Sequence, residues 1–126
     1  MKISRWLVVI VLVAILVSAC GPAATPTAAK PFRIAVIMPS AITDMAFSQS
    51  MYNALKAVQT EMGGESALEI KYSENMFKVP DAAAAIRDYA TSGFDIVIAH
   101  GSQYGSSVQE IAKDFPKVTF AWGTDV

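Results

Sequence analysis

Apolar and polar residues follow three successive patterns along this chain. The first is an unbroken apolar run from Trp6 to Val17, and the second is a stretch of small residues and prolines over 21–31. From Phe32 onward, short apolar runs alternate with segments of helical spacing. The third pattern is that of a folded unit, which we place at 32–126, with no internal repeat.

Four short segments of this unit have the patterns of strands. Residues 33–38 and 96–99 are near-continuous apolar runs, typical of strands covered on both faces. In the segment 68–72 apolar residues alternate with Glu69 and Lys71, which predicts a strand with one wet face at the sheet edge. The segment 118–122 predicts a fourth strand.

Three segments between these strands have helical spacing. The first has one apolar stripe and ends at Gly63-Gly64, and its members are Phe47, Met51, Leu55, Val58 and Met62. The second helix is predicted over 81–92, with Pro80 before it and Gly93 as its stop. The third is predicted over 106–115.

This alternation predicts an α/β fold: a three-layer parallel sheet with right-handed crossovers and strand order 2-1-3-4. Ligands bind such sheets beyond the carboxyl ends of the strands, where the strand order reverses. The loops 39–46 and 100–105 therefore form the predicted site. The fourth strand is too apolar for an outer edge, so we expect an incomplete lobe, the front part of a longer protein.

The amino-terminal run indicates a secretory signal that ends at Cys20. Lys2 and Arg5 precede twelve apolar residues, and Val17-Ser18-Ala19 leads to the only cysteine. A membrane-spanning helix needs about 20 such residues. We therefore predict a lipoprotein signal over 1–19, lipidation of Cys20, and a lipid-anchored flexible linker over 20–31, which places the protein on the extracytoplasmic face of the cell membrane. An ordinary cleaved signal with an incidental cysteine is the alternative.

Charge and motif content disfavour several other functions. Cleavage before Cys20 would change the formal net charge from −1 to −3, which is not the balance of a nucleic-acid-binding protein. The serine in the segment 101–105 is misplaced for a nucleophile elbow, one histidine leaves no second base, and we expect no cofactor. Asp44, Asp95 and Asp125 are dispersed, and an acidic metal site made from them stays an open alternative to simple loop or cap roles.

Four segments carry a family resemblance: 34–39, 42–50, 95–101 and 112–120. They resemble the basic membrane protein family, the substrate-binding lipoproteins of ABC importers that are similar to purine nucleoside receptors. The resemblance implies a periplasmic-binding-protein-like (type I) amino-terminal lobe, covering about a third of a two-lobed member. Ala46 and Ser48 depart from the glycine and asparagine that are usual in the family.

The resemblance and the predicted loops together give a set of candidate ligand-binding residues. Asp44 is implied to accept a hydrogen bond from a ligand base, or it caps a helix. Phe47 stacks on a flat ring, or it belongs to the buried stripe. The other candidates either offer polar groups or a close backbone approach to a ligand, or have structural roles as caps, exposed residues or a core histidine. These candidates are Ser48, Gln49, His100, Gly101 and Ser102.

Two functions follow from this reading. The first is an extracytoplasmic solute-binding lipoprotein that delivers a nucleoside or a related aromatic solute to an ABC permease. The second is an envelope lipoprotein that has kept the fold but acts through a protein partner. Neither is an enzyme.

Overall fold

The computed structural model describes residues 30–123 as a parallel four-stranded sheet with helices on both faces. The strands are β1 (Phe32–Ile37), β2 (Leu68–Ser73), β3 (Ile96–His100) and β4 (Thr119–Gly123). The helices are α2 (Phe47–Glu61), α3 (Val79–Thr91) and α4 (Gly105–Ile111), with short 3-10 turns at Ser102–Tyr104 and Ala112–Asp114. The predicted signal, Cys20 and almost all of the predicted linker lie outside the described residues.

The strand order is β2-β1-β3-β4, as predicted. Every pair is parallel, with Ile34 aligned to Ile70 on one side and to Ile96 on the other. The run from Ile34 to Met38 is buried because β1 lies in the middle of the sheet. The alternating strand β2 lies at one edge, which confirms its expected place, and β4 lies at the other end of the described sheet.

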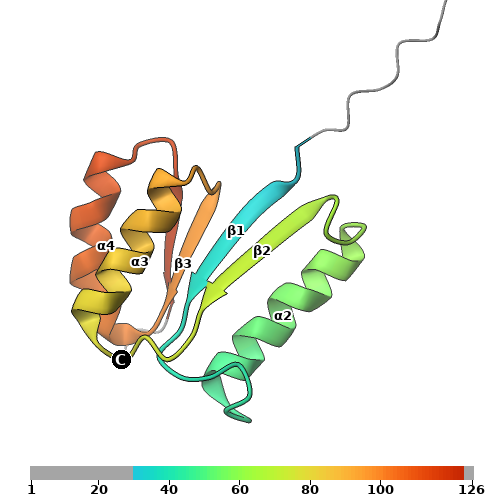
Figure 1. Ribbon diagram of the computed structural model, residues 1–126, viewed down its shortest axis with the longest axis horizontal. Helices are drawn as coiled ribbons and strands as arrows, with labels where there is room; N and C mark the ends of the chain where they lie inside the picture. Colours follow the sequence, from blue (N-terminus) through green and yellow to red (C-terminus); the bar gives the residue numbers. More distant parts are fainter. Residues whose placement is uncertain (1–29, 124–126) are drawn as a thin grey trace, which may run out of the picture.

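The two faces of the sheet are covered unequally. Helices α3 and α4 lie together on one face, and α2 lies alone on the other (Figure 1). Under α3 and α4, Ile37, Ile86 and Tyr104 belong to a core cluster that is almost wholly inaccessible. A smaller buried cluster lies under α2 and includes Val36, Leu55 and Leu68.

Three sequence predictions need correction. The buried face of α2 is formed by Ser48, Leu55 and Gln59, whereas Val58 and Met62 are exposed. The predicted stripe was wrong because the spacing of apolar residues does not show which polar residues are buried with hydrogen-bond partners. Ile96 and Ile98 are only half-buried, since α2 does not cover all of the strand that was predicted to be fully covered. The helix predicted over 106–115 is α4, which begins at Gly105 and gives way to a 3-10 turn after Ile111.

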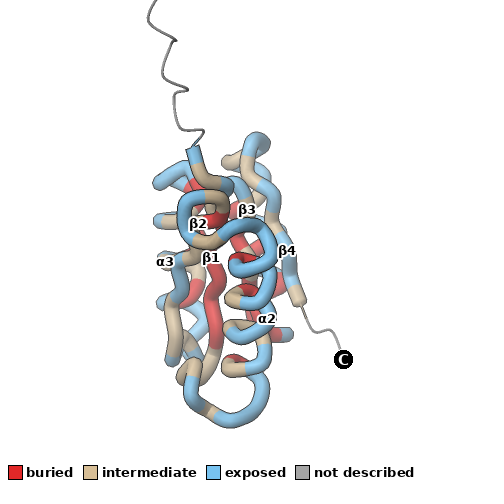
Figure 2. Tube along the Cα trace, turned by 90° about the vertical axis from the view of Figure 1, so that its right-hand side faces the viewer, coloured by how far each residue is buried: buried red, intermediate tan, exposed pale blue. Residues whose placement is uncertain are grey.

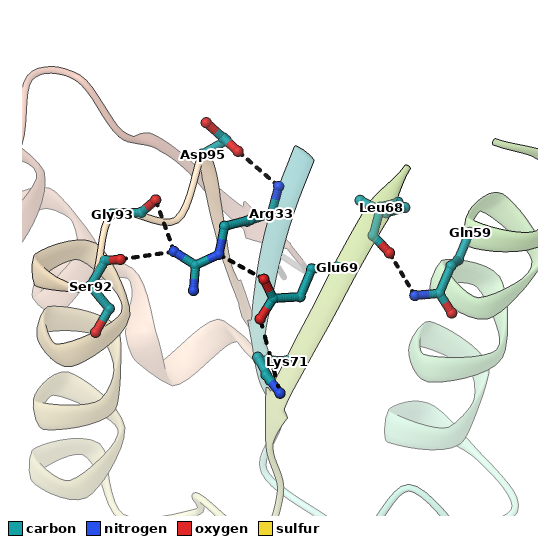
Figure 3. Close-up of polar contacts among 8 residues, drawn as sticks. All are labelled: Arg33, Gln59, Leu68, Glu69, Lys71, Ser92, Gly93 and Asp95. Carbon is teal, nitrogen blue, oxygen red and sulfur yellow. Dashed lines mark hydrogen bonds and ion pairs between the residues drawn. The ribbon is translucent and has the colours of Figure 1, made fainter. Parts of the chain in front are cut away.

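Arg33 joins the amino ends of three strands (Figure 3). Its Nε donates to Glu69 Oε2 at 2.9 Å, and its Nη1 donates to the carbonyl oxygens of Ser92 and Gly93 at 2.9 and 3.3 Å. The backbone N–H of Arg33 donates to Asp95 Oδ2 at 2.8 Å. This cluster occupies the end of the sheet opposite to the predicted site, which leaves the carboxyl end for ligand contacts.

Burial along the chain is deepest in the middle of the sheet and falls toward its edges and loops (Figure 2). Within residues 30–123, no helix has the length and apolar character needed to cross a membrane.

Candidate functional site

The structure brings the two predicted loops together at the carboxyl ends of β1 and β3. After β1 the chain crosses to β2 on one side, and after β3 it crosses to β4 on the other, so this is the point where the strand order reverses. The ring of Phe47, the residue that follows the first loop, stacks on the ring of His100 with centroids 3.8 Å apart and planes 14° apart. The His100 Nε2 also lies 3.2 Å from the Phe47 carbonyl oxygen.

Phe47 combines this contact with partial exposure. It is the first residue of α2 and is 37% exposed, although His100 covers one of its ring faces. It therefore does not belong to the buried face of α2. An aromatic ring that is held on one side and open in part is suited to stacking against a flat solute.

Asp44 caps the start of α2 with both carboxylate oxygens. Oδ1 accepts hydrogen bonds from the backbone N–H groups of Ala46 and Gln49, at 2.9 and 3.1 Å. Oδ2 accepts from the Ser40 hydroxyl at 2.5 Å and from the Ser48 N–H at 3.0 Å. The Ser40 hydrogen bond and then the Ala46 N–H hold the pKa of Asp44 well below its usual value. Four donors fill the usual acceptor capacity of a carboxylate, so a ligand would have to compete with the cap.

Ser48 faces inward. It is 0% exposed, and its hydroxyl lies 2.7 Å from the Ser40 hydroxyl while accepting from the Ser40 N–H at 3.3 Å. In this arrangement Ser48 holds the loop after β1 against α2. A direct contact with a ligand would require this buried pair to separate.

Gln49, in the first turn of α2, is more accessible than the neighbouring Ser48. Its Oε1 accepts from the Met45 N–H at 2.8 Å, a contact that does not use its amide nitrogen. Met45 has a φ of 58° and a side chain that is 91% exposed, so this contact stabilises a backbone conformation that is uncommon outside glycine. The amide group of Gln49 can still donate to a solute.

Close packing in the second loop requires a glycine at position 101. A Cβ at Gly101 would lie 2.8 Å from Gln103 Oε1 and from the Tyr104 ring, so any side chain would push the loop out of place. Trp122 Nε1 donates to the Gly101 carbonyl oxygen at 3.0 Å. Ser102 is exposed at the start of the following 3-10 turn, where its hydroxyl is accessible to a ligand.

Burial determines the protonation of His100. The residue is 7% exposed, and desolvation lowers its pKa, against the smaller opposing effects of the Phe47 carbonyl and the Asp44 carboxylate. His100 is therefore neutral at physiological pH.

Sequence reasoning missed a support from the loop after β2. Glu74 Oε2 accepts from the Ile42 N–H at 2.8 Å, and the Asn75 N–H donates to the Ser40 carbonyl oxygen at 3.2 Å. Glu74 directly follows an edge strand whose carboxyl end meets the same edge of the sheet as β1. That position was the available signal, because parallel strands place their following loops together.

Two hollows of the described residues lie outside these loops. One of about 430 Å³ lies between α2 and β2 and is lined by Tyr52, Lys56 and Tyr72, among others. Another, of about 490 Å³, lies beside α3 near Tyr89. The candidate site at the carboxyl ends of the strands coincides with neither hollow. We assign it from the convergence of loops rather than from the size of a hollow.

Of the dispersed aspartates, Asp44 and Asp95 do not share a site. Asp44 follows the carboxyl end of β1, whereas Asp95 precedes β3 and accepts from the Arg33 N–H at the opposite end of the sheet. Asp125 lies outside the described residues. Over 30–123, no three His, Cys, Asp or Glu side chains come together in an arrangement that could hold a metal ion.

Comparison with known proteins gives the family of this chain. The family model of the ABC transporter substrate-binding proteins that are PnrA-like matches residues 32–123. The chain belongs to this family.

Two known proteins are similar to this chain, one in fold and one in sequence. The fold is similar to that of an ABC transporter system solute-binding protein from Conexibacter woesei DSM 14684, with a TM-score of 0.66 and 23% identity, over 75% of this chain and 30% of that one. The sequence is 27% identical over 114 residues to the transcriptional activator protein med of Bacillus subtilis (strain 168), over 90% of this chain and 34% of that protein. The chain thus spans about a third of the length of either.

Proposed function

We propose that this chain is a lobe of an extracytoplasmic solute-binding lipoprotein of an ABC importer, which binds a nucleoside or a related flat aromatic solute and delivers it to a membrane permease. Family membership supports the class of protein. The observation that carries the solute class is Phe47, because its ring is fixed by His100 and still 37% exposed at the reversal point of the sheet.

The affinity of this lobe alone should be low. One stacked ring contributes about 1–3 kcal/mol and each hydrogen bond about 0.5–1.5 kcal/mol, before the cost of association. A millimolar complex needs about −4 kcal/mol and a micromolar one about −8 kcal/mol. We therefore expect millimolar binding to this wall, and micromolar binding only with an opposite wall.

A nuclear magnetic resonance titration of the purified protein with adenosine tests the solute class. We expect shifts to concentrate in the loops 39–46 and 100–105, and Phe47→Ala to weaken binding about ten- to a hundredfold, which at this affinity abolishes the shifts. Phe32→Ala is the matched control, since Phe32 is 42% exposed at the amino end of β1, away from these loops. Equal shifts in wild type and Phe47→Ala would contradict the stacking role.

The lipid anchor is a separate part of the proposal and rests on Cys20. Two or more acyl chains give stable membrane attachment, at about 0.8 kcal/mol for each buried methylene. Cys20→Ser should leave the protein unlipidated, either released from membranes or unprocessed. Labelling with a radioactive fatty acid and membrane fractionation measure this. A variant that is labelled and fractionates like wild type would exclude the anchor.

A second candidate is a regulatory protein that acts through a protein partner. It is favoured by the 27% identity to a protein named as a transcriptional activator. The two candidates differ in their dependence on solute. Genes for an ATPase and permeases beside this one would favour import, whereas the absence of any nucleoside-dependent shift would favour the partner-based role.

A further inference from the structure

The two ring nitrogens of His100 have unequal environments. Nε2 lies 3.2 Å from the carbonyl oxygen of Phe47, and Nδ1 is buried with no hydrogen-bond partner in the part of the chain that the structure describes. A carbonyl oxygen can only accept, so the proton of the neutral ring must be on Nε2. Nδ1 is then a bare acceptor inside a residue that is 93% buried, since only 7% of it is exposed.

A buried acceptor without a donor is rare in folded proteins, and each one calls for an explanation, of which a further group that binds there is one. This one lies at the carboxyl end of β3, in the loop pair already assigned to the solute. The nearby carboxylate of Asp44 cannot satisfy it, because a carboxylate is also an acceptor and its oxygens already receive four hydrogen bonds. The missing partner is therefore a donor from outside the described residues.

A glycine of the neighbouring strand lies beside this nitrogen. His100 aligns with Gly123 of β4, and a Cβ added to Gly123 would have Nδ1 as its neighbour, at 3.8 Å. Gly123 has no side chain to fill this space. Farther along the same face of β4, Ala121 is exposed because α2 does not extend over that strand. This is the side from which a solute group would have to reach the buried Nδ1.

We infer that His100 is a specificity-determining residue whose Nδ1 accepts a hydrogen bond from an O–H or N–H group of the solute, a group outside the plane of the stacked ring. The inference rests on the proposed function. The donor must be out of plane because Phe47 lies between the imidazole and a solute stacked on its other face, with 3.8 Å already separating the two protein rings. A sugar hydroxyl of a nucleoside meets this requirement, whereas the edge of a free base does not.

The first test needs no solute. His100 is the only histidine in the chain, so ¹⁵N ring signals of the purified protein report on it alone. We expect a protonated Nε2 and an unprotonated Nδ1 at neutral pH. A proton on Nδ1 would overturn the inference and leave the proposed function standing.

The second test compares adenosine with adenine at equal concentrations. Adenosine should shift the Nδ1 resonance toward that of a hydrogen-bonded acceptor, and adenine should shift the loop resonances but not Nδ1. If both solutes shift the loops and neither moves Nδ1, His100 does not read the solute, although the proposed function holds. If neither solute shifts any resonance, the proposed function and this inference both fail.

Gly123→Ala supplies the matched variant. The added methyl group would be in ordinary van der Waals contact with Nδ1, so the fold should be retained while the approach to Nδ1 is blocked. We expect the adenosine-dependent shift of Nδ1 to be lost and the discrimination between adenosine and adenine to disappear. Ala84→Ser, at an exposed position of α3 on the opposite face of the sheet, should leave both unchanged. Persistence of the Nδ1 shift in Gly123→Ala would overturn the inferred path to the nitrogen.

Discussion

The two faces of the sheet differ in how completely helices cover them. The face under α3 and α4 buries Ala35, Ile37 and Val97 almost completely. On the opposite face, under α2, Ile96 and Ile98 are only half-buried, and Ala121 is exposed. Helices α3 and α4 cover the first face and α2 covers the second (Figure 1).

The buried residues of the helices differ in kind as well. The inner face of α3 consists of Ala82, Ile86 and Ala90, which allows close apolar packing. The inner face of α2 includes Ser48 and Gln59, whose polar groups are hydrogen-bonded inside the protein. The α2 side therefore contributes less apolar burial, and it is also the side that presents Phe47 and His100. We expect local opening to be easier there, because stability within a domain follows buried apolar contact.

The largest difference between the two faces should appear in the free energy of unfolding, when one isoleucine on each face is replaced by alanine. Ile37→Ala, on the α3 and α4 face, should lower the free energy of unfolding by about 2–5 kcal/mol, because the residue is fully buried and leaves a cavity. Ile98→Ala should lower it by about 1–2 kcal/mol, because part of that side chain is already in water.

Urea unfolding followed by circular dichroism measures both values. The comparison holds only if the slope of the free energy against urea is unchanged, since a changed slope indicates an altered unfolded or native state. Equal losses at the two positions would show that the α2 face is packed as tightly as the other.

On the α2 side, a buried polar residue, Gln59, holds the helix to the sheet. Its Nε2 donates to the Leu68 carbonyl oxygen at 2.7 Å and so joins α2 to the start of β2 (Figure 3). Gln59→Leu keeps the volume but removes the donor, and a buried carbonyl without a partner costs about 1–3 kcal/mol. The same urea measurement should detect this loss.

Gln109→Leu is the control for that substitution, since Gln109 is exposed on α4 and should change stability by no more than about 0.5 kcal/mol. An unchanged or increased stability of Gln59→Leu would mean that apolar contact, rather than the hydrogen bond, holds α2 to the sheet.

Most of the fold could be predicted because each element has a local pattern in the sequence and the order of the elements determines the sheet. The β-branched run of β1, the alternation in β2 and the Gly93 stop after α3 each determined an element, and their order determined the parallel sheet. The face of α2 could not be predicted, because the burial of Ser48 and Gln59 depends on Ser40 and on the Leu68 carbonyl, which spacing alone does not reveal.

The candidate site was predictable only to the level of its loops. The rule for parallel sheets selected the loops after β1 and β3, and the structure joins them through the stack of Phe47 on His100. The position of Glu74 after β2 placed it at the same edge, but the hydrogen bonds that Glu74 and Trp122 make there could not be predicted, because they depend on side chains that reach across from other loops and strands. Spacing indicates where a strand ends, but not which backbone groups need a partner there.

The smallest change that we expect concerns Asp44 and depends on pH. Its folded-state pKa is lowered, so the charged form stabilises the start of α2 above the ordinary aspartate pKa of about 3.9, and this stabilisation is lost as the pH falls toward the lower folded value. Asp44→Asn removes the charge and one of the two acceptor oxygens. It should unfold at a lower urea concentration than wild type at pH 7, with a gap that narrows below pH of about 4. Asp88→Asn, at an exposed position of α3, is the control and should show no such trend. A gap that stays constant as the pH falls would mean that Asp44 acts through its shape rather than its charge, and the α2 side would then lack the electrostatic cap that sets it apart from the other face.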